Sequence, residues 1–87
     1  MFGDFKMAAQ YVVIEIQNYD DGTVGTLVNS YEDRDSAASK FHTILAAAAI
    51  SQLPCHGATW LNVDGSLVDW KAFRHSPSAN TSEVTNP

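Results

Sequence analysis

The chain has 87 residues, which is room for one small domain. Its composition, with 45% apolar and 17% charged residues, is typical of a globular protein and excludes a disordered or disulfide-built chain. Ten acidic residues against five basic ones give a net charge of −5, which disfavours binding to phosphate backbones and to anionic lipid. We therefore expect no direct nucleic-acid partner and no membrane partner.

The ends of the chain differ in composition from the middle. We expect residues 1–9 to be a short, disordered leader, with Met7 as an alternative start, and residues 76–87 to be a disordered polar tail. Residues 10–75 then form a single domain. The single cysteine, Cys55, cannot form an internal disulfide, and the sequence begins without the features of a secretory signal, so a cytoplasmic protein is expected.

The segment from Gln10 to Gln17 alternates with period two, which predicts a half-buried strand. We expect its core side to carry Val12, Ile14 and Ile16. Asp21-Gly22 then predicts a hairpin turn into a second strand over about 23–31. Two registers stay open for that strand. A two-residue loop sets Leu27 opposite Ile16, whereas a three-residue loop brings Val24 and Val28 to the core side.

A helix is predicted to follow, with Asp33 as its N-cap and Asp35 in its first turn. Pro54 ends the helical region. Apolar residues at helical spacing form one stripe that should face the sheet: Ala37, Phe41, Ile44, Leu45 and Ala48.

Asp64-Gly65 predicts a second hairpin with a two-residue loop, which pairs Leu61 with Val68 and Thr59 with Trp70. The predicted fold is α+β, in the order β-β-α-β-β: a four-stranded antiparallel sheet with one helix packed on one face. In the last hairpin we expect the core side to carry Leu61, Val63, Val68, Trp70 and Ala72.

The opposite, outer face of this sheet is predicted to be only partly polar. Exposed aromatic residues on such a face favour a protein-binding surface. In the alternative interpretation, Lys71 and Asp69 flank Trp60 and cover it, leaving no functional patch. The candidate binding residues are Tyr11, Val13, Glu15, Trp60, Asp69, Lys71 and Phe73.

The helix is also apolar on the side away from its core stripe, which predicts a helix-mediated interface such as a symmetric homodimer. The alternative is that Ile50 and Leu53 fold back under the sheet at the end of the helix. The candidate interface residues are His42, Ala46, Ala49, Ile50 and Leu53.

Candidate chemistry is sparse. Cys55 and His56 are neighbours on a predicted strand, so they point to opposite faces and do not chelate one ion together. His42 and Cys55 are candidates for a base and nucleophile pair, but no third residue is apparent that would orient them. The Asp-Gly turns lack the spaced acidic pattern of a calcium loop, and the sequence carries no phosphate loop or nucleophile elbow. We expect no enzyme activity, cofactor or metal.

The strand sequence YVVIEIQ, the turn DDGTVG and the helix sequence SKFHTILAAAAIS together resemble a group of small uncharacterised proteins encoded in phages and prophages of Gram-positive (Firmicute) gut bacteria. The resemblance covers about residues 7–64, in the run VIEIQ…DGTVG…HT.LAAAA…P.H. Those proteins start near the equivalent of Met7, so the residues before it and the polar tail depart from their length. The resemblance implies a phage context and a compact cytoplasmic or virion-associated product, and it brings no catalytic residues.

These observations predict a non-enzymatic, phage-type protein-binding module. One version inhibits a host defence nuclease, as anti-CRISPR proteins do, with acidic side chains facing a basic nucleic-acid channel: Glu15, Glu32, Asp33 and Asp69. The alternative is a small head or tail accessory protein of the virion that self-assembles. In either version the partner is another protein, a homo-oligomer is expected, and the location is the host cytoplasm or the virion.

Overall fold

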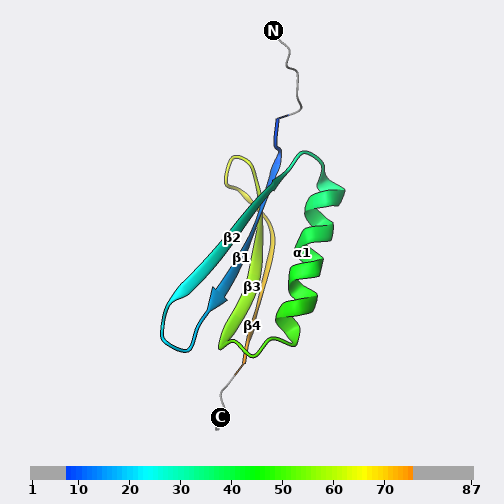
Figure 1. The fold of residues 1–87 in the computed structure, drawn as a ribbon. Coiled ribbons are helices and arrows are strands. Elements are labelled where there is room, and N and C mark those ends of the chain that lie inside the picture. The colour runs from blue at the N-terminus through cyan, green and yellow to red at the C-terminus, as the bar shows by residue number, and fades with distance from the viewer. Residues whose placement is uncertain (1–7, 76–87) are drawn as a thin grey trace.

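The computed structural model describes residues 8–75. Its elements are β1 (Tyr11–Asn18), β2 (Val24–Tyr31), α1 (Arg34–Ala49), β3 (Cys55–Asn62) and β4 (Leu67–Arg74). The four strands form one antiparallel sheet in the order β2-β1-β3-β4, and α1 lies across one face of it (Figure 1). The predicted fold class is therefore confirmed. The predicted tail, and most of the predicted leader, lie outside the described residues.

The helix begins and packs as its sequence predicts. The Asp33 carboxylate accepts a hydrogen bond from the backbone N–H of Ser36 at 2.9 Å, which satisfies one of the free N–H groups of the first turn. The helix ends at Ala49, before Pro54. Four members of the predicted stripe are buried against the sheet, and Leu45 packs against them half-buried: Ala37, Phe41, Ile44 and Ala48.

The helix covers the face of the sheet that the strand pattern assigned to the outside. Val13 and Trp60 are buried beneath it, and the Trp60 ring lies 5.6 Å from the Phe41 ring, centroid to centroid. Tyr11 and Tyr31 pack against the same cluster. The predicted core side of β1, with Val12, Ile14 and Ile16, is therefore the face turned away from the helix, and that prediction is wrong.

The sizes of the packed side chains explain why the helix covers the face that carries the aromatic residues. The buried helix positions Ala37 and Ala48 are small, so large side chains from the sheet fill the space beside them. Trp60 fills the space beside Phe41, and edge contact with Tyr11 at a centroid distance of 6.3 Å extends the cluster. Aliphatic residues on both faces made the period-two pattern ambiguous about which face the helix would choose.

Both hairpins turn through three residues, each with a glycine at positive φ. In the first turn the N–H of Tyr19 donates to the carbonyl of Thr23 at 2.9 Å, with Gly22 at φ +89°. This selects the three-residue alternative, in which Val28 lies opposite Ile14. Val24 and Val28 thus share the face of Ile14, although that face is not the core.

The second turn has the same form, so the predicted two-residue loop is wrong. The N–H of Asn62 donates to the carbonyl of Ser66 at 2.8 Å, and Gly65 has φ +94°. Leu61 consequently pairs with Leu67, and an irregularity between Trp60 and Leu61 shifts the register so that Thr59 pairs with Trp70, as predicted. The shift places Val68 against the core while Trp70 lies on the other face.

Three aspartates hold these local structures, and their hydrogen bonds lower their pKa values. Asp21 accepts from the hydroxyl and N–H of Thr23, and Asp64 does the same from Ser66. Asp33 accepts from the N–H of Ser36. Because the folded pKa values lie below the unfolded ones, the unfolded chain binds more protons at low pH. This contribution to stability is present above the ordinary aspartate pKa and is lost as the pH falls through the lowered values.

We therefore expect the thermal midpoint to fall as the pH drops below about 4, the ordinary range of aspartate. Circular dichroism melts across this range measure the effect. The triple variant Asp21→Asn, Asp33→Asn, Asp64→Asn should have a lower midpoint at neutral pH and a weaker dependence on pH. An equal dependence in both proteins would show that these carboxylates do not supply it.

The uncovered face of the sheet as a candidate protein-binding site

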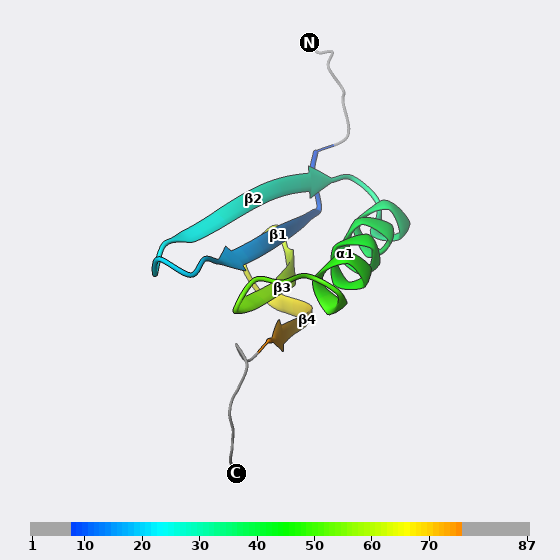
Figure 2. The same cartoon turned by 60° about the horizontal axis from the view of Figure 1, so that its bottom comes forward.

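The face of the sheet away from α1, here called the open face, is a grid of cross-strand neighbours. Because side chains alternate along a strand, the registers place these residues on one side. No helix or strand of residues 8–75 covers this side (Figures 1 and 2). From the start of β1 toward its end, the rows are Ser30, Val12, Leu61 and Leu67; Val28, Ile14, Thr59 and Trp70; Thr26, Ile16, Gly57 and Ala72; Val24, Asn18, Cys55 and Arg74.

The open face is apolar and almost free of charge. Trp70 is 60% exposed and Val28 62%. Val28 stands beside the half-buried Ile14 of β1, and Trp70 stands beside Thr59 of β3. Among the described strand residues, Arg74 is the one charged member of this face, at the edge of its last row. A continuous apolar face of this kind is uncommon on a protein that works without a partner, which makes it the candidate binding site.

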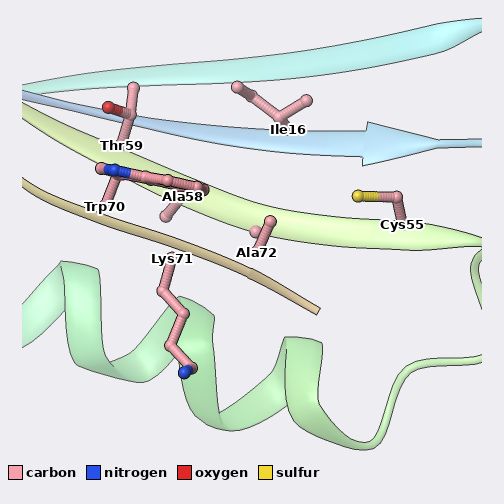
Figure 3. A pocket seen from close by; sticks show the side chains of 8 residues that line it. Ile16, Cys55, Ala58, Thr59, Trp70, Lys71 and Ala72 are labelled. Carbon is pink, nitrogen blue, oxygen red and sulfur yellow. The ribbon is translucent and has the colours of Figure 1, made fainter. Parts of the chain in front are cut away.

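A shallow hollow of about 180 Å³ lies on the open face. It is lined by Gly57 and its strand partner Ala72. The Trp70 side chain lies beside them (Figure 3). Lys71 runs toward the helix side instead, as the alternation requires. The residues that shape the hollow are Ile16, Cys55, Gly57, Thr59, Trp70 and Ala72.

Gly57 permits the close approach of β3 and β4 under this hollow. A Cβ atom at position 57 would lie 2.4 Å from the carbonyl oxygen of Lys71 and 2.6 Å from Cα of Ala72. Both are backbone atoms of the paired strand, so an added methyl group forces the strands apart.

We expect Gly57→Ala to lower the free energy of unfolding by about 1–3 kcal/mol, the usual cost of overpacking. Urea denaturation measures it. Gly22→Ala is an informative comparison, since nothing lies within 4 Å of the added Cβ there and its cost comes from the positive φ alone. If Gly57→Ala left the free energy of unfolding unchanged, the close approach of β3 and β4 at Gly57 would be contradicted.

The seven residues predicted to form the outer binding face lie on the helix side instead. Trp60 is only 5% exposed, and the Arg34 guanidinium carbon lies 4.9 Å from the centre of its ring. Lys71, which the alternative interpretation placed over Trp60, has its ammonium 5.2 Å from the Phe73 ring. The assignment to an uncovered face is therefore wrong for the whole set, which pairs across the helix-covered side: Tyr11, Val13, Glu15, Trp60, Asp69, Lys71 and Phe73.

Glu15 and His56 form a buried polar pair on this helix side. Nε2 of His56 donates to the Glu15 carboxylate at 2.7 Å, with the two side chains 7% and 14% exposed. Gln17 donates to the same carboxylate at 3.2 Å. Glu15 is therefore engaged inside the domain and does not face a basic channel, contrary to the prediction. Sequence reasoning missed the pair because the two residues are 41 positions apart.

The outward side of the helix, predicted to form an interface, is open to solvent. His42, Ala46 and Ala49 are exposed, Ile50 is 85% exposed, and Leu53 is half-buried. The alternative in which Ile50 folds back under the sheet is wrong. These residues are mostly small, so this side presents a weaker apolar surface than the open face.

The described residues offer few groups for chemistry. Among residues 8–75 no group of three or more potential metal-ligating side chains is found. Cys55 and His56 point to opposite faces, as predicted, with Cys55 beside the hollow and His56 beneath the helix. Within the same range, no helix has the length and apolar character needed to cross a membrane.

No protein-family model, curated protein sequence or solved structure matches this chain.

Proposed function

We propose that the chain is a non-enzymatic, phage-type protein-binding module whose binding surface is the open face. The observation that carries this proposal is the contrast between the two faces of one sheet. One face carries the buried cluster beneath α1, whereas the other leaves Trp70 and Val28 largely exposed to water. Burying apolar surface yields about 25 cal/mol per Å², so a complementary protein gains substantially by covering this face.

The inhibitor version of this function, an anti-CRISPR-like block of a host defence nuclease, draws its support from the acidic end of the molecule. Residues of the β2–α1 connection and the β3–β4 turn lie at the same end of the sheet, where Tyr11 pairs with both Tyr31 and Asn62. A basic partner seated on the open face would meet these carboxylates at its rim. These carboxylates are Glu32 and Asp33 in the connection, Asp35 in the first turn of α1, and Asp64 in the β3–β4 turn.

The alternative version is a virion accessory protein that self-assembles. It draws its support from the near absence of charge on the open face. Two copies of an acidic chain can meet there without opposing carboxylates. The edge strand β2 adds to this support, because its sequence VGTLVNSY contains no charged residue or proline that would discourage strand pairing.

Affinity capture tests the proposed function. The full chain, immobilised, is exposed to Gram-positive host lysate supplemented with untagged copies of itself. The comparison is between Val28→Glu, on the open face, and Leu27→Glu, its neighbour on the opposite side of β2. Leu27 is 54% exposed and Val28 62%, so both substituted side chains enter solvent. Because Leu27 pairs with Glu15 across the strands, circular dichroism must first show that Leu27→Glu is folded.

We expect a protein to be retained by the wild type and by Leu27→Glu and to be lost from Val28→Glu. Retention of nothing, or of the same proteins by all three, would overturn the proposal. Identification of the retained protein separates the two versions, because a host nuclease supports the inhibitor and the chain itself supports the assembly protein.

A further inference from the structure

We infer that the occupant of the open face is a second copy of this chain, related by a two-fold axis that sets Trp70 of each copy against the hollow of the other. This inference rests on the proposed function, since it names the partner of the same surface. Three features of the open face carry it: its shape, its charge and its area.

The shape is self-complementary. The row from Val28 to Trp70 is bulky, and the next row, through Gly57 and Ala72, is low and contains the hollow. A two-fold axis that crosses the strands between these rows exchanges them, so the ridge of each copy faces the hollow of the other. In such an isologous contact both copies use the same surface, so the assembly closes as a dimer.

The charge distribution favours a second copy over a basic partner on this face. The chain is acidic, yet every carboxylate of residues 8–75 lies off the open face, in the two turns, around the start of α1 or on the helix side. Glu15 and Asp69 are placed on the helix side by their pairing with Ala58 and Trp60. A basic partner would find no counter-charge within this surface, whereas two copies bring together surfaces without like charges in contact.

The area is sufficient for a dimer. Four strands about 4.8 Å apart, each of eight residues rising about 3.3 Å per residue, cover a flat area of roughly 500 Å². Two copies thus remove about 1,000 Å² of flat area from water. The projecting side chains make the buried accessible area larger than this flat area. This reaches the size of a specific protein interface, and face-to-face packing of two sheets is a common architecture.

Sedimentation velocity of the full chain over a dilution series tests the inference. We expect a monomer–dimer equilibrium for the wild type. Trp70→Ala should raise the dissociation constant about tenfold or more, as loss of a central tryptophan does at an interface. Val28→Glu should sediment as a monomer at concentrations where the wild type is dimeric, with its circular dichroism spectrum unchanged.

Two control variants locate the interface. Leu27→Glu lies on the same strand but the other side, and Ala46→Glu lies on the outward side of α1. Both should dimerise as the wild type does. A dimer broken by Ala46→Glu, or one unaffected by both Trp70→Ala and Val28→Glu, would overturn the inference. Because two open-face variants are used, a folding defect in one does not leave the question undecided.

A wild type that stays monomeric at every concentration would also overturn the second copy as the occupant. The proposed function would survive that result if the lysate still supplies a protein that Val28→Glu fails to retain. Failure of both experiments together would remove the open face as a binding surface.

Discussion

Trp60→Ala is expected to lower the free energy of unfolding by about 3–5 kcal/mol, the usual cost of removing a buried aromatic side chain. Trp60 is 5% exposed and packs against Phe41 and Tyr11 beneath α1. A domain of this size has a total stability of about 5–10 kcal/mol, so the variant should be largely destabilised at room temperature. Urea denaturation in dilute protein, below the concentration at which the wild type dimerises, measures the loss.

Trp70→Ala provides the matched control for this prediction. The two tryptophans lie on adjacent strands, but Trp70 is 60% exposed on the open face. Its replacement should cost the isolated protomer about 1 kcal/mol or less. Equal losses from both variants, or a larger loss from Trp70→Ala, would contradict the placement of α1 on the Trp60 side.

Glu15→Ala is expected to cost about 3 kcal/mol, because it leaves the buried His56 ring without its 2.7 Å partner. Nδ1 of His56 already has no hydrogen-bond partner among residues 8–75, so the ring would lose its remaining hydrogen bond. Chemical denaturation of the variant measures the change.

Glu15→Gln distinguishes the loss of a hydrogen-bonding partner for His56 from the loss of side-chain volume at position 15. Its amide fills the same space and keeps a polar partner for His56, so it should retain much of the stability that Glu15→Ala loses. Gln17→Ala removes a longer hydrogen bond to the same carboxylate, 3.2 Å, and leaves the contact between Glu15 and His56 in place, so it should cost less. A loss below about 1 kcal/mol for Glu15→Ala would show that the pair is not sealed from water.

Sequence patterns predicted the elements well because their signals are local. Asp33 as N-cap and the stripe around Phe41 follow from helical geometry within a few residues, and Asp-Gly dipeptides marked both turns. The element order then required an antiparallel sheet with one helix. Loop length was harder to predict, because Asp64-Gly65 suits both a two-residue turn and the three-residue turn found here.

The local sequence pattern could not show which face of the sheet the helix covers. That choice determines where the candidate site lies. Val12, Ile14 and Ile16 have the residue types of a core strand, while the covered side of β1 includes Glu15. Glu15 is accommodated because His56, on the neighbouring strand, provides its partner. Two features of the sequence favoured the opposite choice of face. Gly57 has no side chain, which lowers the open face, and the two tryptophans, Trp60 and Trp70, occupy strand positions that point to opposite faces.

Acrylamide quenching of tryptophan fluorescence in dilute protein, with Trp60→Phe and Trp70→Phe compared, shows which face of the sheet α1 covers. Each variant keeps one tryptophan, and phenylalanine preserves the ring packing at position 60, where Nε1 has no hydrogen-bond partner among the described residues. The structure predicts that Trp70, the reporter left in Trp60→Phe, is readily quenched, and that Trp60, the reporter left in Trp70→Phe, is shielded. A shielded Trp70 beside a quenched Trp60 would place the helix on the other face and contradict the account.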